Sequence, residues 1–392
     1  MKFSLEDYTS YVVISGSHSY GTATTDSDVD IRGWYIPPKK LFLSRSLDFY
    51  TINQTYDKAD NFPWINQLKR RVIQNPIIDV SLYDFHKFIN LATKCNPNIV
   101  ELLFVDKEDI LYMDDLAKLL RRNRKLFLTT RAVHTFSGYA HSQLKRIRTH
   151  RSWILHPPSH KPTREEFGLP NYSLIPEDQR QAANKLIDEM ARLWLLEKVD
   201  IDKEIIERLR EDLVQIVAYI LHDRGITKAI DEEKVMEIVR WAAAKGYDMS
   251  DSYTAVLQQE KKYRAALNHW KQYQTWKANR NPVRAELERK YGYDTKHAMH
   301  LIRLLLQAQE ILSSGTLTLK DPERARFLQK IRGGKMSYDE LVMLADNLDS
   351  QLIKRYKEKD YVVPHSPDLE KISTLTAEIT EAAFQLQKRG ET

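Results

Sequence analysis

The sequence is poor in cysteine, since Cys95 is the only one among its 392 residues. No disulfide can form within the chain, and a zinc site built from paired cysteines is excluded. A chain without disulfides fits a reducing compartment, so we expect a cytoplasmic protein. No run of about 18 apolar residues is present, and the N-terminal segment MKFSLEDYTS lacks the apolar stretch of a secretory signal. We therefore expect neither a membrane span nor export.

Glycine is also scarce, with 12 glycines against 20 tyrosines and 7 tryptophans, and 29% of the residues are charged. This composition indicates a largely helical chain. The apolar fraction of 42% is enough for a core, so a wholly disordered protein is excluded. The net charge of +6 favours polyanionic partners such as RNA, DNA or nucleoside triphosphates, although a solvated basic surface would give the same balance.

Three short runs near the N-terminus have the composition of β-strands: residues 11–15, 28–36 and 77–82. The first ends at Gly16-Ser17, a turn signal, and the second ends at two prolines. Residues 84–93 follow the third run with apolar side chains at helical spacing. The pattern predicts a small α/β domain over residues 1–125.

Beyond residue 125 the sequence predicts helices and almost no strands. The amphipathic stretches are residues 129–151, 177–198, 202–224, 231–245, 252–279, 294–314, 336–357 and 367–388. Residues 156–176 contain five prolines and are expected to form a loop or an extended arm. The expected fold class is α+β, with a large mainly helical domain over residues 126–392.

An acidic strand beside a glycine-serine loop carries the strongest chemical signal. Asp28 and Asp30 are two residues apart, so in a strand their carboxylates point to the same face. Such a pair can share divalent cations, and Asp79 in a neighbouring strand is the natural third ligand. Gly16 permits close backbone approach, and Ser17 adds a hydroxyl for the β and γ phosphates of a nucleotide.

Each part of this pattern also has an ordinary structural interpretation. An Asp-x-Asp pair alone is common on solvated strands and turns, and Ser27 could serve only as a turn residue. The order of the parts favours a functional interpretation: a strand, Gly-Ser, about ten residues, Asp-x-Asp and then an isolated aspartate in a third strand. We include Ser27 among the expected nucleotide-binding residues.

The segment GSHSYGTATTDSDVDIRGWYIPP, residues 16–38, resembles the nucleotidyltransferase signature of the DNA polymerase β superfamily. Its Tyr-Gly and Ser-Asp-x-Asp-x-x-Gly variant is similar to the RNA-repair-associated (RlaP-like) family, as are residues 95–104 and 292–305. The resemblance implies a polymerase-β-like domain at the N-terminus. It also implies that Asp28, Asp30 and Asp79 are metal ligands and that Gly16 and Ser17 bind triphosphate.

Residues 294–308 predict a helix with one polar stripe, which Asp294 or Thr295 can cap. Lys296, His300 and Arg303 lie on this stripe, and we expect them to contact the nucleotide phosphates. An ordinary solvated face is the alternative. The histidines at positions 297 and 300 could also form a metal pair, but the sequence indicates no third ligand.

A second basic helix is expected around Lys145, Arg146 and Arg148, close to another positive segment, RRNRK, at residues 121–125. These side chains could follow a nucleic-acid backbone, and we regard them as nucleic-acid-binding residues. A solvated face explains the same pattern equally well.

The function predicted from these features is transfer of a nucleoside monophosphate from an NTP to an acceptor hydroxyl, with Mg²⁺ or Mn²⁺ as cofactor and pyrophosphate as leaving group. An RNA end, such as that of tRNA in a repair setting, is the favoured acceptor. A protein hydroxyl, as in AMPylation or a toxin-type system, and a small molecule are the alternatives. A catalytically silent RNA-binding protein is a fourth interpretation.

Overall fold

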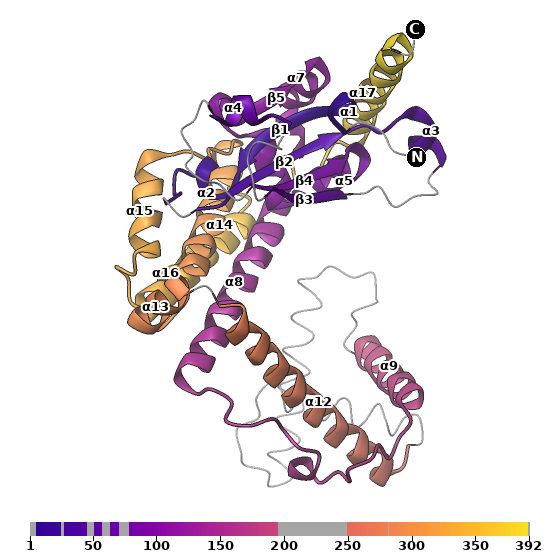
Figure 1. Cartoon of the computed structure of the whole chain (residues 1–392), viewed down its shortest axis with the longest axis vertical. Helices are drawn as coiled ribbons and strands as arrows, with labels where there is room; N and C mark the ends of the chain where they lie inside the picture. Colours follow the sequence, from indigo (N-terminus) through magenta and orange to yellow (C-terminus); the bar gives the residue numbers. More distant parts are fainter. Residues whose placement is uncertain are drawn as a thin grey trace. The chain divides into compact units, whose positions relative to one another are not determined.

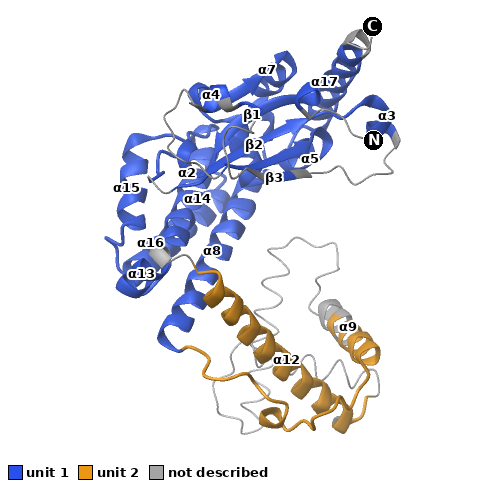
Figure 2. Ribbon diagram, in the orientation of Figure 1, with its two compact units in different colours: residues 1–156, 281–392 blue, residues 157–280 orange. Residues whose placement is uncertain are grey.

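The computed structural model describes residues 5–24, 27–44, 51–56, 63–69, 78–194, 249–280 and 282–390. The chain forms two compact units (Figure 2). Unit 1 combines Met1–His156 with Asn281–Thr392, and unit 2 contains Pro157–Arg280. Within the described ranges, no helix has the length and apolar content needed to span a membrane.

Unit 1 is built around a mixed sheet with the strand order β3-β4-β2-β1-β5 (Figure 1). The strands are β1 (Thr9–Ser15), β2 (Val29–Tyr35), β3 (Thr51–Tyr56), β4 (Ile78–Asp84) and β5 (Ile110–Met113). Strands β2 and β4 run parallel, and every other neighbouring pair is antiparallel. The parallel pair places the beginnings of β2 and β4 at the same edge of the sheet.

The two faces of this sheet differ because side chains alternate along each strand. One face carries a cluster of buried apolar side chains that includes Trp64, just before α4 (Ile65–Lys69), and Leu68 within it. On the other face, Tyr11 and Trp34 join a larger core formed with the helices. That second face continues to half-buried polar side chains at the beginnings of β2 and β4, so the helices cover only part of it.

The helices of unit 1 pack mainly on this second face. They are α1 (Leu5–Tyr8), α2 (Gly16–Ser19), α3 (Lys39–Ser44), α4, α5 (Phe85–Thr93), α6 (Pro97–Val100), α7 (Asp115–Arg122), α8 (Arg131–Leu155), α13 (Pro282–Tyr291), α14 (Thr295–Ser314), α15 (Pro322–Arg332), α16 (Tyr338–Lys357) and α17 (Leu369–Gly390). Buried residues of α5, α8 and α14 share the core that contains Trp34. In this core the Trp34 and Phe85 rings lie 4.6 Å apart.

Side-chain caps explain where several of these helices begin. Asp84 accepts a hydrogen bond from the third residue of α5, and Asp294 does the same for α14. Asp321 caps α15 ahead of a proline at the first helical position. Ser337 and Glu340 form a reciprocal capping box at the start of α16.

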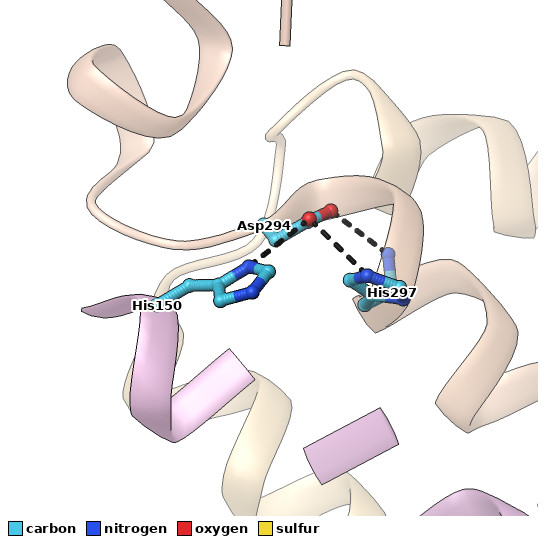
Figure 3. A group of neighbouring side chains, drawn as sticks. All are labelled: His150, Asp294 and His297. Carbon is cyan, nitrogen blue, oxygen red and sulfur yellow. Dashed lines mark hydrogen bonds and ion pairs between the residues drawn. The ribbon is translucent and has the colours of Figure 1, made fainter. Parts of the chain in front are cut away.

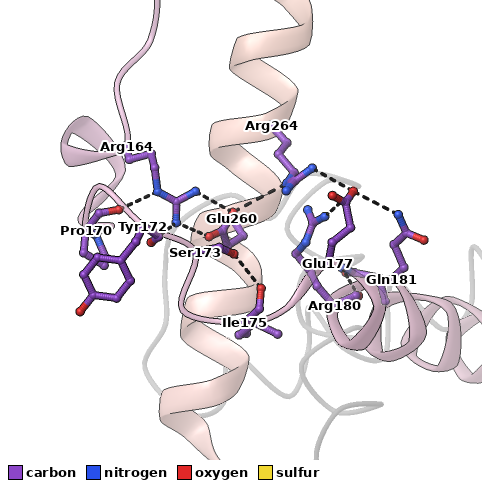
Figure 4. A network of polar contacts seen from close by, with 11 residues as sticks. Arg164, Pro170, Tyr172, Ser173, Ile175, Glu177, Arg180, Gln181, Glu260 and Arg264 are labelled. Carbon is purple, nitrogen blue, oxygen red and sulfur yellow. Dashed lines mark hydrogen bonds and ion pairs between the residues drawn. The ribbon is translucent and has the colours of Figure 1, made fainter.

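Unit 2 is described for α9 (Glu177–Trp194), α12 (Asp251–Ala278) and the proline-rich segment 157–176. That segment contains a single 3-10 turn, and Arg164 anchors it (Figure 4). Arg164 donates to the carbonyls of Pro170 and Tyr172 at 2.6 and 3.0 Å and pairs with Glu260, whose side chain is 0% exposed. The predicted arm is therefore held against α12.

The α+β fold class predicted from the sequence is confirmed, as are three predicted strands and six of the eight predicted helical stretches. The stretches 202–224 and 231–245 lie outside the described residues. The predicted domains divide near residue 125, whereas the first compact unit continues to His156 and resumes at Asn281. Helices α8 and α14 join the sheet in unit 1 because their buried side chains belong to its larger core.

Candidate active site

Two of the three predicted metal ligands lie side by side in the sheet. Asp30 of β2 and Asp79 of β4 are direct partners in the parallel register, so their side chains emerge from the same face. Both residues are half-buried. Asp28 precedes β2 by one residue and is exposed. Its position two residues before Asp30 corresponds to the same face of the extended chain.

The glycine-serine turn lies directly against this pair. Ser15 at the end of β1 is the register partner of Asp30, and the chain then turns at Gly16 with φ +66°. A Cβ atom on Gly16 would lie 2.4 Å from Asp30 Oδ2. Glycine therefore serves two purposes here: it permits the left-handed backbone, and it leaves room beside the carboxylate. Ser17 follows, half-buried, and in the described part of the chain its hydroxyl has no hydrogen-bond partner.

Helix α15 holds the far side of this loop. Gln329 and Arg332 donate to the carbonyls of Gly21 and Thr22 at 3.1 and 2.6 Å, respectively. Ser27, further along, accepts a hydrogen bond from the Thr24 amide at 2.9 Å, and its own amide donates to the Thr24 carbonyl at 3.0 Å. Ser27 is therefore a turn residue in this structure, and its contact with nucleotide stays a prediction.

Arg32 also belongs to this cluster, although it was not predicted from the sequence. It lies two residues after Asp30, on the same face of β2, and its guanidinium is 2.8 Å from Asp30 Oδ1. It also donates to the main-chain carbonyl of Asp79 at 2.9 Å. Arg32 thus holds the two aspartates in place. The spacing that selected Asp28 and Asp30 would also have found Arg32.

Arg303 is placed inside the protein rather than on a nucleotide-facing stripe. It is 5% exposed, forms an ion pair with Glu101, and donates to Gln307 at 2.7 Å. Glu101 in turn accepts from the Tyr20 hydroxyl at 2.5 Å. Burial, with Glu101 adding to it, raises the pKa of Tyr20 well above its usual value. This network anchors the loop that begins at Gly16, because Tyr20 belongs to that loop.

Lys296 and His300 remain on the half-buried side of α14. Burial lowers the pKa of His300 well below its usual value, and the nearby charges of Arg303 and Lys296 lower it further. His300 is therefore neutral at physiological pH and can contact a phosphate only as a hydrogen-bonding group. Lys296 is the cationic member of the predicted stripe on that side.

The predicted nucleic-acid-binding residues lie on the solvent side of α8. Lys145, Arg146 and Arg148 are exposed, and none of them forms an ion pair within the described ranges. The helix runs from Arg131 to Leu155, so it begins two residues after the start of the predicted stretch 129–151 and ends four residues beyond it. Exposure alone does not separate a nucleic-acid contact from a solvated face, so this role stays a prediction.

The residues at the sheet edge fit a divalent metal. Asp28, Asp30 and Asp79 supply carboxylate oxygens, which are the ligands that Mg²⁺ and Mn²⁺ prefer. The space beside Asp30 Oδ2, which any side chain at Gly16 would fill, gives access to that oxygen. Arg32 already engages the other oxygen, Oδ1, so a metal ligated through Oδ1 would have to displace the guanidinium.

Comparisons with known proteins relate the N-terminal part of the chain to a nucleotidyltransferase family. Residues 7–155 match the RNA repair pathway DNA polymerase beta family, RlaP. An uncharacterized 38.9 kDa protein in the nrdC-mobD intergenic region of Enterobacteria phage T4 is 30% identical over 130 residues, which cover 33% of this chain and 35% of the relative. The uncharacterized protein YcgL of Bacillus subtilis (strain 168) is 30% identical over 141 residues, covering 34% and 45%. The chain thus spans less than half of the length of either relative.

A solved structure, that of a nucleotidyltransferase-like protein from Exiguobacterium sibiricum 255-15, aligns over 70% of this chain and 76% of its own, with 13% identity. The TM-score of this alignment is 0.22. The match of residues 7–155 contains all three aspartates and the Gly-Ser turn. This match over residues 7–155 confirms the resemblance predicted from the motifs of the segment.

Proposed function

We propose that the chain is a metal-dependent nucleotidyltransferase that moves a nucleoside monophosphate from an NTP to an acceptor hydroxyl. The observation that carries the proposal is the pairing of Asp30 with Asp79 across parallel strands, with Gly16 directly beside the Asp30 carboxylate. A carboxylate pair beside a glycine turn is an arrangement suited to metal-bound polyphosphate.

Each residue has a distinct task in this proposal. The amides around Gly16 and the Ser17 hydroxyl hold the β and γ phosphates, and Lys296 supplies positive charge to them. Asp28 and Asp30 would hold the metal ions, while Asp79 would hold the metal ion on the acceptor side and orient the attacking hydroxyl. When bound, divalent metal supplies Lewis-acid stabilisation of the charge that develops on the phosphoryl oxygens. Arg32 orients the Asp30 carboxylate while it is bonded to the main-chain carbonyl of Asp79.

An RNA end is the acceptor that the charges favour. Lys145, Arg146 and Arg148 present three exposed cations on one helix, and the chain has a net charge of +6. The family description also refers to RNA repair. A protein hydroxyl or a small molecule would make less use of an exposed basic helix, and these acceptors are outcomes that the experiment separates.

The test is incubation of the full chain with each α-labelled NTP, Mg²⁺ or Mn²⁺, and total RNA. Label is expected in RNA with the wild-type protein and with Asp346→Asn, an exposed aspartate of α16 that serves as the charge-matched control. Asp30→Asn and Asp79→Asn should reduce transfer at least 100-fold, because each removes a metal ligand. Folding of every variant is checked by circular dichroism.

The result also distinguishes the competing functions. Label that enters protein or a small molecule would overturn the RNA acceptor but keep the transferase. Binding of RNA without labelling of any acceptor would support a silent RNA-binding protein. Undiminished transfer by Asp30→Asn would contradict the proposed chemistry itself.

The salt dependence of RNA binding tests the basic helix separately. Arg146→Gln should reduce the slope of log K against log salt by about 0.7 if this residue contacts a single-stranded phosphate. Lys118→Gln, an exposed cation of α7, is the control that should leave the slope unchanged. Equal slopes for both variants would assign α8 to the solvated surface.

A further inference from the structure

Three side chains with metal-binding groups converge at the start of α14, apart from the carboxylates of the sheet (Figure 3). Asp294 is the N-cap of α14, His297 lies in its first turn, and His150 lies near the end of α8. One ligand atom from each lies within 4.8 Å of the other two. All three residues belong to unit 1.

The distances approach those of a bound metal. Asp294 Oδ2 is 3.6 Å from His150 Nδ1 and 3.5 Å from His297 Nε2. Atoms that bind one zinc ion tetrahedrally at about 2.0–2.1 Å lie roughly 3.4 Å apart. These two separations are within a few tenths of an ångström of those in a zinc site, and all three ligand atoms lie within 4.8 Å of one another.

The surrounding hydrogen bonds orient these groups toward a shared point. Gln143 Oε1 lies 2.7 Å from His297 Nδ1, and an amide oxygen can only accept, so this nitrogen carries the proton. The lone pair of Nε2 then faces Asp294 Oδ2. Asp294 Oδ1 is separately engaged by the His297 amide at 3.0 Å. A lone pair facing a carboxylate oxygen requires a cation between them, which is either an additional proton or a metal ion.

Two further features favour a metal ion. Outer hydrogen bonds from a histidine to a carbonyl oxygen, such as that to Gln143, accompany metal-ligating histidines in general. The ring of Trp153 stacks on His150 at 5.5 Å and shields this side of the cluster.

We propose that His150, Asp294 and His297 bind one transition-metal ion, Zn²⁺ in the first instance, with water in the fourth position. Two imidazole nitrogens and one carboxylate oxygen suit zinc better than Mg²⁺, which prefers oxygen ligands alone. The side chains of His150 and His297 are each 17% exposed, so solvent can reach the open position. The ion fastens the first turn of α14 to α8 and thereby fixes the position of Lys296.

The test uses the full chain, stripped with a chelator, reloaded with Zn²⁺ and desalted. Elemental analysis should find one zinc per chain, and the melting temperature should rise with added Zn²⁺ because the ion binds the folded state. Co²⁺ in place of Zn²⁺ should give the visible absorption of a four-coordinate site. None of these measurements depends on nucleotidyl transfer, so their failure is distinct from failure of the proposed function.

Two variants and one control make the assignment specific. His297→Ala removes a ligand, and Asp294→Asn removes a carboxylate while keeping an equally good helix cap. Both should lose the zinc and the shift in melting temperature. His141→Ala is the control, because this histidine also lies on α8 and its side chain is 60% exposed. It should retain one zinc.

Two results would overturn the proposal. A wild-type protein that retains no zinc and shows no Co²⁺ spectrum contains an imidazolium–carboxylate cluster instead. Equal zinc content in wild type and His297→Ala would place the ion elsewhere. Circular dichroism of the metal-free variants confirms that each is folded, and His150→Asn serves as a second ligand variant should His297→Ala fail to fold.

Discussion

Removing one charge of the buried Glu101–Arg303 pair should destabilise unit 1 strongly, and removing both should cost less than the sum of the two single losses. The two side chains are 3% and 5% exposed, so water cannot replace a lost partner. Glu101→Leu leaves a buried guanidinium uncompensated, and Arg303→Leu leaves a buried carboxylate. Each is expected to lower the free energy of unfolding by about 3–5 kcal/mol. Glu101→Leu additionally leaves the Tyr20 hydroxyl without its acceptor, which costs about 1–3 kcal/mol.

The double variant separates a structural role from a nucleotide-binding one. With both charges gone, no buried charge is left uncompensated. The Tyr20 hydroxyl and Gln307 still lose partners, and the Tyr20 ring loses the Arg303 guanidinium, so the loss of stability should be smaller than the sum of the single losses by several kcal/mol. Urea unfolding followed by circular dichroism, with nucleotide absent, measures all four proteins. Lys354 and Glu358 form an exposed control pair, 72% and 60% exposed, whose coupling should stay below about 1 kcal/mol. Single variants within about 1 kcal/mol of wild type would refute the reasoning.

Two further predictions concern the loop and α14. Gly16→Ala should abolish transfer, because a Cβ atom at this position would lie 2.4 Å from Asp30 Oδ2 and must displace the carboxylate. Gly315→Ala is the control: its φ of +63° is similar, but the nearest atom to the added Cβ lies at 3.4 Å. This variant should lose roughly 1–2 kcal/mol of stability and keep its activity. Equal activity of the two variants would contradict this. His300 has a folded-state pKa lowered by burial, so only the unfolded state takes up its proton near pH 6.5. Stability should therefore fall as pH drops below that value, by at most about 1.4 kcal/mol per pH unit, and His300→Gln should show a flatter profile in thermal unfolding between pH 7 and 5. Parallel profiles would show that His300 titrates normally.

The sequence predicted those strands that carry a strong local pattern. Strands β1, β2 and β4 have β-branched or alternating residues over most of their length, and their ends carry turn signals or a helix cap. Strand β3, with the sequence TINQTY, lies at the sheet edge and has no continuous apolar face. Strand β5 has four residues, too few to show a period of two. Both were missed because their pairing depends on neighbouring strands rather than on their own sequence.

The candidate site shows the same limit. The order of the Gly-Ser turn, Asp28, Asp30 and Asp79 is local information, and it predicted the neighbouring strands that bring Asp30 and Asp79 together. The burial of Arg303 depends on Glu101, which is 202 residues away in the chain, and no periodicity reports such a partner. For the same reason the sequence suggests only His300 as a partner of His297 in a metal pair, whereas in the structure His297 lies beside His150 and Asp294.

Helix α15 could have been predicted. Asp321 followed by Pro322 is a recognised start signal for a helix, and Arg332 lies in its last turn. The helix matters because it carries Gln329 and Arg332, which donate to carbonyls of the loop that begins at Gly16. Its contact with that loop, in contrast, joins residues about 310 positions apart and follows only from the fold.

A crystal structure with Mn²⁺ and a non-hydrolysable NTP analogue tests the central claim most directly. We expect an anomalous manganese peak coordinated by carboxylate oxygens of Asp30 and Asp79, with the triphosphate against Gly16 and Ser17 and with Arg32 displaced from Asp30 wherever Oδ1 becomes a ligand. Manganese bound away from these two aspartates, or a triphosphate that does not reach the Gly-Ser turn, would contradict the account.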